Sequence, residues 1–421
     1  MASLKQRCCQ SASKGENGGV GDSNSGGASR PDPGAGKEAG PGAEAAAGAF
    51  EHPGSGRAAA TAAGGSRGGV NLPVLREHNT ALVLALLRGA RDRGLSRVGL
   101  AARTGLTPQA VSKIVARLRA DGLVAEAGQR ASTGGKPRTV LRLAPAARHA
   151  VGLQLDRDEL TVVLVDLYGS VVAARVTPLD LGAGPGTVVE RAAGEVEALL
   201  AAEGRDHVLG VGVAMPGPLD HAAGVARRVT RFPEWDGYPL RDAVAARLAM
   251  PAVLDKDTNA GALGLGPGAG DSYAYLHLGT GLGAGLVLDG AVHRGARTGA
   301  GEFGHQVIEL GGPECGCGRR GCIEALCLAA VARGDFGEAA RILGVGAANL
   351  VALLDIDRVL LGGRVIESDS AVAGLFVGEL RRSAGIPVAL AGGGPRLVAR
   401  GAAELVLAPL FGGATPRPLT P

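Results

Sequence analysis

A histidine and three cysteines in one short glycine-rich stretch constrain the fold of this 421-residue chain more than any other feature. The stretch contains His305, Cys315, Cys317 and Cys322, and Glu324 follows directly after it. One imidazole and three thiolates suit a closed, tetrahedral Zn2+ site of the structural kind. Glycines between the cysteines let the loop turn tightly around an ion. The sequence therefore predicts a structural zinc centre that fixes this loop relative to a helix beginning near Cys322.

The remaining cysteines and the N-terminus bear on the cell compartment. Cys8 and Cys9 lie in a low-complexity segment, and Cys327 has the spacing of a buried helical residue. Residues 1–10 contain no apolar signal-peptide core, and no uninterrupted apolar run is long enough to span a bilayer. We therefore expect a cytoplasmic protein with reduced thiols, in which a tight cysteine cluster indicates a metal rather than a disulfide. The alternative is a set of reduced cysteines in a loop that holds no metal.

A basic segment separates a low-complexity N-terminus from the main body. Residues 1–70 are mostly Gly, Ala, Ser and Pro, a composition that cannot bury enough surface to offset its ordering entropy, so we expect disorder there. Residues 71–143 carry 13 Lys and Arg against 4 Asp and Glu, although the whole chain has a net charge of only +4. A basic segment on a mildly acidic body is typical of a protein in which one part binds nucleic acid.

Helical spacing and capping residues indicate three helices in this basic segment. The first contains the apolar repeat Val74–Leu87. The second covers Arg97–Thr104, with Ser96 as its N-cap and a glycine after its end. In the third, Thr107 is the N-cap and Pro108 is the first helical residue, where the missing N–H is harmless. This order is that of a helix-turn-helix.

A glycine-rich basic loop follows, between strand-like pieces at Leu123–Ala127 and Thr139–Leu143. Three helices and a β-hairpin form a winged helix-turn-helix, in which the third helix enters the major groove and the wing lies along the backbone. Gln109 can pair with an adenine edge, and Lys113 and Arg117 suit guanine or phosphate. The residues expected at DNA are Ser96, Arg97, Thr107, Gln109, Ser112, Lys113, Arg117, Lys136 and Arg138. The alternative is a three-helix protein-interaction module whose arginines only solvate its surface.

Strands and helices alternate through the rest of the chain. The first segments are three strand-like runs, a helix and a buried strand: Val151–Leu155, Leu160–Leu167, Ser170–Val176, Val188–Ala202 and Val208–Met215. Because the alternation continues to Leu410, the predicted fold class of the body is α/β.

The zinc pattern and several other motifs resemble the ROK family (repressors, open reading frames and kinases), whose members share a two-lobed actin/hexokinase-like fold. The matching stretches are His78-Asn79, Ser96-Arg97, Thr104-Gly-Leu-Thr107, Thr133-Gly-Gly-Lys-Pro137, Val211–Pro218, Trp235, Asp257–Ala260, Gly279–Gly285 and Leu361–Gly363. The resemblance implies a winged helix-turn-helix at 71–144 and a ROK sugar-kinase-like domain at 145–412. One lobe would cover about 145–260 with the C-terminal helix, and the other about 261–394.

Four residues are carried over from the family as neighbours of a sugar: Asp257, Glu302, His305 and Glu324. Carboxylates suit a sugar because each can accept hydrogen bonds from two vicinal hydroxyls. In the family's kinases the residue matching Asp257 is also the base that activates the sugar hydroxyl. The resemblance thus assigns His305 both to zinc and to the pocket, one ring nitrogen for each.

The phosphate turn departs from the family's kinases, which have an Asp-x-Gly-x-Thr pattern there. Gln154 stands in place of the aspartate, Asp156 and Arg157 replace small glycines, and Asp158 would repel a phosphate. This departure resembles the family's repressors and argues against phosphoryl transfer, so we read the glycine loop Gly279–Gly285 as pocket floor.

Two further departures concern the ligand and the assembly. Lys256 replaces an asparagine, which favours an anionic ligand such as a sugar phosphate, and Ala325–Leu343 is shorter than the usual helical segment. The resemblance implies a non-enzymatic transcriptional regulator, in particular a repressor of carbohydrate uptake or metabolism genes. Its partners would be a double-stranded DNA operator, a sugar or sugar phosphate effector, and a second copy in a homodimer. The alternatives are an ATP-dependent sugar kinase with a DNA-binding head and a ligand-free dimerisation scaffold.

Overall fold

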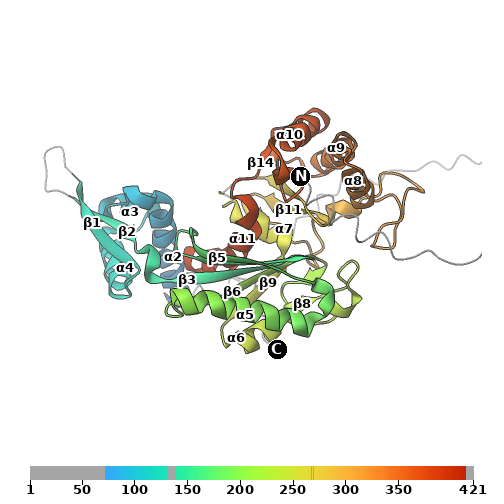
Figure 1. Cartoon of the computed structure of the whole chain (residues 1–421). Helices are drawn as coiled ribbons and strands as arrows, with labels where there is room; N and C mark the ends of the chain where they lie inside the picture. Colours follow the sequence, from blue (N-terminus) through green and yellow to red (C-terminus); the bar gives the residue numbers. More distant parts are fainter. Residues whose placement is uncertain (1–71, 131–137, 267, 269, 414–421) are drawn as a thin grey trace, which may run out of the picture. The chain divides into compact units, whose positions relative to one another are not determined.

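The computed structural model describes residues 72–130, 138–266, 268 and 270–413 (Figure 1). The segment 1–70, expected to be disordered, and Lys136 of the wing lie outside the described residues.

The predicted winged helix-turn-helix is present. Its elements are α2 (Leu72–Ala90), α3 (Arg97–Thr104), α4 (Pro108–Ala120), β1 (Val124–Arg130) and β2 (Arg138–Leu143). Both predicted N-caps are confirmed: the Ser96 hydroxyl accepts from the Gly99 amide at 3.1 Å, and the Thr107 hydroxyl accepts from the Ala110 amide at 3.2 Å. Strand β1 runs three residues past its predicted end because antiparallel pairing resumes after an irregularity beyond Glu126.

The first sheet of the body has the strand order β5-β4-β3-β6-β9. Its strands are β3 (His149–Leu155), β4 (Glu159–Val165), β5 (Val171–Pro178), β6 (Val208–Met215) and β9 (Ala252–Lys256). Strands β3 to β5 correspond to the three predicted runs and pair in order as an antiparallel meander, and β6 has its predicted bounds. Helices α5 (Pro185–Glu203) and α6 (Leu240–Leu248) pack their apolar residues on one face, and β7 (Leu219–Asp220) pairs with β8 (Val225–Ala226).

The second sheet has the order β12-β11-β10-β13-β14. Its strands are β10 (Tyr273–Leu278), β11 (Leu282–Leu288), β12 (Ala291–Val292), β13 (Arg358–Gly362) and β14 (Val388–Leu390). One face is covered by α8 (Ile323–Ala332), α9 (Phe336–Leu354) and α10 (Ser370–Ala384). Helix α9 is long and apolar enough to cross a membrane by length and composition, but its residues Ala339, Leu343 and Ala347 are buried in this core.

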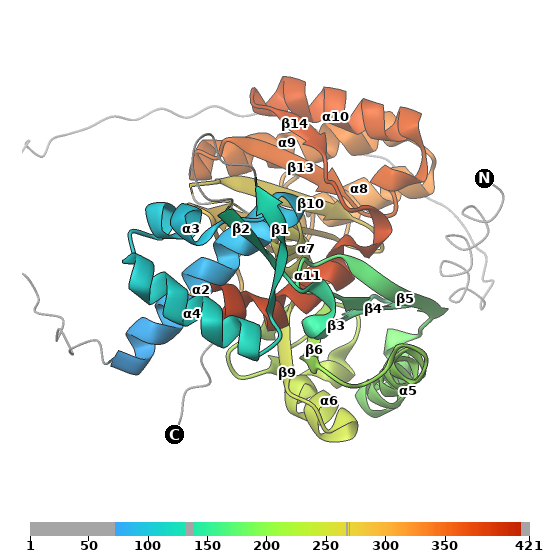
Figure 2. The same cartoon turned by 90° about the vertical axis from the view of Figure 1, so that its left-hand side faces the viewer.

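Two helices lie between the sheets, α7 (Asp257–Gly264) and α11 (Leu397–Leu407) (Figures 1 and 2). Glycines allow α11 to approach the first sheet closely. A Cβ at Gly152 would lie 1.9 Å from the Ala399 carbonyl oxygen, and one at Gly212 would lie 1.8 Å from that of Ala402. Glycine within a strand is typical of such close backbone approach.

Helix α2 joins the helix-turn-helix to the body. Arg88 forms an ion pair with Glu404 of α11, and its guanidinium lies 4.4 Å from the centre of the Phe411 ring. Leu87 belongs to one apolar cluster with Ala403 and Leu407. The two parts therefore share a core along α11.

Candidate functional site

The face of α4 expected to read DNA is open to solvent. Gln109, Ser112 and Lys113 are all exposed on this helix. Arg117 is exposed as well, but its guanidinium donates to the Thr80 hydroxyl of α2. The first three side chains are therefore available to base edges, whereas Arg117 is drawn back toward the first helix.

Among the other expected DNA contacts, Ser96 and Thr107 use their hydroxyls to cap α3 and α4, whereas the arginines lie in an ion-pair group or on the wing. Arg97 lies 3.7 Å from the Glu126 carboxylate, which Arg119 also approaches to 2.9 Å. Ion pairs on the surface contribute only about 0–1 kcal/mol, so a DNA phosphate can replace Glu126. Arg138, at the start of β2, is exposed.

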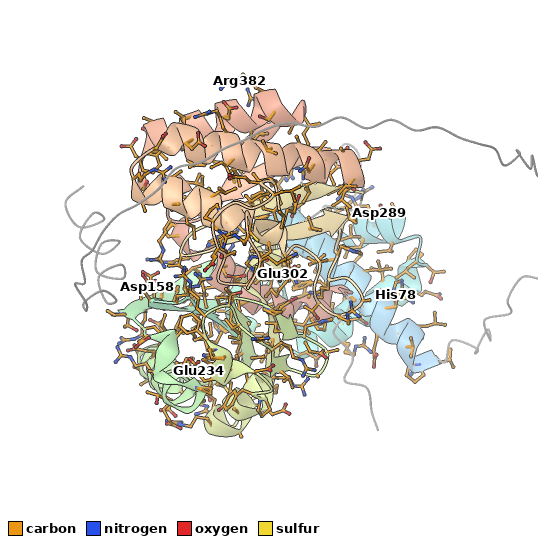
Figure 3. The ribbon with its side chains drawn as sticks, turned by 90° about the vertical axis from the view of Figure 1, so that its right-hand side faces the viewer. His78, Asp158, Glu234, Asp289, Glu302 and Arg382 are labelled. Atoms are coloured by element: carbon orange, nitrogen blue, oxygen red, sulfur yellow. The ribbon has the colours of Figure 1, made fainter. Side chains whose placement is uncertain are left out.

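The four residues carried over as sugar neighbours line one cleft: Asp257, Glu302, His305 and Glu324. The cleft contains about 560 Å³ of non-atom space, counting open solvent at its mouth. Figure 3 views the side of the molecule that carries Glu302. The segments that follow the parallel strands β3, β6 and β9 contribute to its wall. This edge is where α/β sheets characteristically bind ligands.

Asp257 is the first residue of α7, and its side chain accepts a hydrogen bond from the Thr258 amide at 2.7 Å. Burial raises the pKa of Asp257 to about 7, and the nearby carboxylates of Asp156 and Glu302 add to this rise. The Thr258 amide and the Lys256 ammonium oppose it. The carboxyl group therefore titrates near neutral pH.

Lys256 is buried and already paired. Only 2% of it is exposed, and its ammonium donates to Glu302 Oε1 at 3.1 Å and to the Ala300 carbonyl oxygen. The expectation that Lys256 favours an anionic ligand is therefore wrong for this arrangement, because its charge is neutralised within the protein. Gly301 permits the close approach: its φ is +83°, and a Cβ there would lie 2.0 Å from the Ala284 carbonyl oxygen.

Glu324 lies in the first turn of α8 and is buried. Its Oε2 accepts a hydrogen bond from the Leu282 amide at 2.9 Å. This bond ties the start of β11, at the end of the glycine loop, to α8 and holds the carboxylate at the cleft. The second half of the predicted glycine loop, Leu282–Gly285, belongs to strand β11, and both Thr280 before this strand and Gly283 within it line the cleft.

The altered phosphate turn is bonded across the cleft. Asp156 Oδ1 accepts from the Thr280 hydroxyl at 2.8 Å, and Arg157 Nη1 donates to the Thr280 carbonyl oxygen at 2.7 Å. Arg364 donates to Asp156 at 2.7 Å and to both oxygens of Asp158. Burial alone would raise the pKa of Asp156, but Arg364 and the Thr280 hydroxyl hold it below its usual value.

Arg364 was missed by the sequence reasoning. It directly follows the Leu361–Gly363 motif and lies 208 residues from Asp156, so no local pattern links the two. The two aspartates in the turn are the signal in the sequence that a cation lies nearby, because two carboxylates so close together require one. The turn carries Asp158, labelled in Figure 3. With Arg364 in place, the turn joins the first sheet to the second.

The predicted zinc ligands come together. The ligand atoms of His305, Cys315, Cys317 and Cys322 all lie within 4.8 Å of one another. His305 Nδ1 is 3.6 Å from Cys315 Sγ, and the sulfurs of Cys317 and Cys322 are 3.7 Å apart. Tetrahedral Zn2+ with its usual bonds to sulfur and nitrogen implies separations of about 3.6 and 3.8 Å. The geometry of the side chains therefore fits a tetrahedral ion, and these cysteines form no disulfide.

The short segment after the zinc loop forms two packed helices. α8 and α9 are separated by only three residues and pack against each other. Cys327 of α8 is buried, as predicted, and its thiol contacts the Ala339 carbonyl oxygen at 3.7 Å.

Comparison with known proteins bears on the identity of both parts. The ROK family model matches residues 150–334, a span that includes the cleft residues from Asp156 to Glu324 and the metal ligands. The body of the chain, over this span, is therefore similar to the ROK family. A MarR family model matches residues 77–132, within the helix-turn-helix.

The chain resembles named relatives over most of its length. It is 27% identical to a "putative xylose repressor" from Caldicellulosiruptor sp. (strain Rt8B.4), over 74% of this chain and 88% of that protein. A crystal structure described as a ROK family transcriptional regulator, homolog of the E. coli MLC protein, matches with a TM-score of 0.65 and 22% identity, covering 80% of this chain and 97% of that one. A ROK family glucokinase from Streptomyces griseus, in complex with glucose and AMPPNP, matches with a TM-score of 0.53 and 26% identity, covering 61% and 98%.

Proposed function

We propose that this protein is a cytoplasmic, homodimeric transcriptional repressor of carbohydrate uptake or metabolism genes, controlled by a neutral sugar bound in the cleft. The observation that carries the proposal is structural continuity. Asp257 begins α7 at the cleft, α7 packs on α11, and α11 pairs with Arg88 of the helix-turn-helix. The relative named as a putative xylose repressor supports a sugar effector.

The hydrogen-bond acceptors that line the cleft favour a neutral polyol as the ligand. Asp257, Glu302 and Glu324 each use one carboxylate oxygen in a bond to the protein. Among the described residues, the second oxygen of each carboxylate has no protein hydrogen-bond partner. Three such acceptors suit a ligand with several hydroxyl donors.

Packing between α7 and α11 offers a route from the sugar to DNA. A Cβ at Gly401 of α11 would lie 1.7 Å from the Ala260 carbonyl oxygen of α7, so the two backbones touch. A tightly packed pair moves together rather than deforming. A sugar that prefers one position of α7 therefore favours one position of Arg88 and of the attached recognition helix.

Zinc would connect the metal loop to the sugar site. When bound, the ion would supply a rigid tetrahedral anchor and no chemistry of its own. His305, Cys315, Cys317 and Cys322 would hold it. His305 presents Nδ1 to the cysteines and also lines the cleft, so the same imidazole can orient a sugar.

A sugar kinase is the competing function, because the glucokinase neighbour shares the fold. The phosphate turn argues against it, because Asp156 and Asp158 carry side chains bonded to Arg364 at the turn where the kinases present backbone N–H donors to ATP phosphates. We expect a coupled ADP-release assay over a panel of sugars to stay at background. Sugar-dependent ADP release that disappears in Asp257→Ala would establish the kinase instead.

The DNA-binding half of the proposal is tested by substitutions on α4 and the wing. Operator sequences are first selected from random DNA with the full-length protein. Gln109→Ala is expected to relax preference at one base step, because a bidentate pair to adenine contributes about 1–3 kcal/mol of discrimination. Arg138→Ala is expected to weaken binding to all sequences alike and to reduce its salt dependence. If both variants gave the same footprints and the same salt dependence of binding as the wild type, this assignment of the DNA-contacting residues would be rejected.

A further inference from the structure

Helix α2 carries an apolar stripe whose residues Leu72, Leu75 and Leu82 are exposed among the described residues, while its last member, Leu86, packs partly against the core of the helix-turn-helix. The α2 stripe consists of Leu72, Leu75, Asn79, Leu82 and Leu86, which follow one another at alternating spacings of three and four residues. This spacing is the a/d repeat of a coiled coil. Leu72 is 68% exposed, Leu75 42% and Leu82 37%, so large aliphatic side chains face solvent.

The other two sides of α2 are occupied. Val83, Leu84 and Leu87 are buried in the core of the helix-turn-helix. Ala81 lies near the C-terminal segment, and Arg88 pairs with α11. The first two turns, Leu72–His78, are exposed throughout, and α2 projects beyond α4 in Figure 2. The stripe is thus a third face of the helix, exposed at its N-terminal end.

We propose that the α2 stripe pairs with the same stripe of a second copy of this chain, in a parallel two-stranded coiled coil. This inference rests on the proposed function only in expecting a dimer. Asn79 occupies an a position, where an asparagine hydrogen-bonds its counterpart and selects two parallel strands in register. The preceding 71 residues cannot supply the complement, because their only large apolar residues are Met1, Leu4, Val20, Phe50 and Val70.

Pairing through α2 also suits DNA recognition. A two-fold axis along α2 relates the two recognition helices by the symmetry of a palindromic operator. The stripe is short, since a helix of this length spans only about 28 Å. The coiled coil therefore contributes only a modest free energy of dimerisation. Its main effect is to hold two helix-turn-helix domains next to each other.

The test uses the full-length protein with Leu75→Asp and Leu82→Asp combined. Sedimentation equilibrium is expected to show at least a tenfold weaker dimer. Affinity for DNA with two half-sites falls at least tenfold, while affinity for a single half-site stays within about twofold. Leu353→Asp, at a leucine of α9 that is 81% exposed, is the matched control and leaves both quantities unchanged. Unchanged zinc content and melting temperature show that each variant is folded.

A second variant locates the contact without relying on loss of binding. In Leu75→Cys, oxidation is expected to join two chains, and mass spectrometry should find position 75 linked to position 75. Dimerisation unchanged in the double aspartate variant would overturn the proposal, as would linkage of position 75 to residues 1–71. Loss of dimerisation in a protein that binds no DNA would reject the proposed function but keep this inference.

Discussion

Replacing Asp257 by alanine is expected to abolish the thermal stabilisation that the effector sugar gives to the wild-type protein. Asp257 stands at the start of α7 with one oxygen held by the Thr258 amide. Its other oxygen has no protein partner among the described residues, so it can accept a sugar hydroxyl. A hydrogen bond to a charged group contributes about 1.5–3 kcal/mol, which predicts a loss of sugar affinity of at least about tenfold.

The measurement is a thermal-shift screen against sugars, amino sugars and their phosphates. Asp206→Ala, at an exposed aspartate far from the cleft lining, is the matched control and should respond like the wild type. A ligand-induced shift that persists in Asp257→Ala would place the sugar elsewhere. A shift given only by phosphates would reject the neutral-sugar assignment.

The same residue predicts a pH dependence of sugar binding. Because burial and the neighbouring carboxylates raise the pKa of Asp257 to about 7, a large fraction is protonated at pH 6 and little at pH 8. The charged carboxylate accepts a stronger hydrogen bond from a hydroxyl than the protonated group does, so affinity should rise from pH 6 to pH 8, by up to about tenfold. The folded state also binds this proton more tightly than the unfolded chain. Its contribution to the free energy of unfolding is therefore lost as pH rises from about 4 to 7. Asp257→Asn should remove the pH dependence of affinity.

Loss of the metal is expected to have the second large effect. Cys322→Ser removes one of four ligands whose atoms cluster within 4.8 Å, and it should reduce zinc from about one ion per chain to near zero. Structural zinc contributes folding free energy directly, so the melting temperature should fall by about 10 °C. Because we propose that His305 both holds the metal and faces the sugar, sugar binding should fall with it.

The control for this substitution is Cys327→Ala. Cys327 is buried in α8 but lies outside the ligand cluster, so its replacement should lower stability without changing the zinc content. Elemental analysis and thermal melts measure both quantities. A wild-type protein that is well folded and free of metal would contradict the assignment of the site.

Local features of the fold were predictable from the sequence, whereas contacts across the chain were not. Ser96 and Thr107 cap their helices as expected, because capping depends on residues three positions apart. The metal cluster likewise lies within one short stretch. The pairing of Arg364 with Asp156 joins residues 208 positions apart, and only the tertiary fold brings them together.

The role of Lys256 was misjudged for the same reason. Its sequence position beside Asp257 suggested a free positive charge at the ligand. In the structure it is buried with Glu302, 46 residues away along the chain, and its ammonium is already engaged by that carboxylate. The placement of α7 and α11 between the two sheets could not be predicted from the sequence either. Glycines within the strands β3 and β6 were its only local signal.

The most direct test of sugar control measures operator affinity of the full-length protein with and without its stabilising sugar. In the wild type we expect the sugar to change the dissociation constant for DNA at least fivefold, and we expect Asp257→Ala to bind DNA normally without responding to the sugar. An unchanged DNA affinity at a saturating concentration of a sugar that binds would contradict this expectation. In that case the cleft would be a ligand site with no connection to the DNA-binding helices.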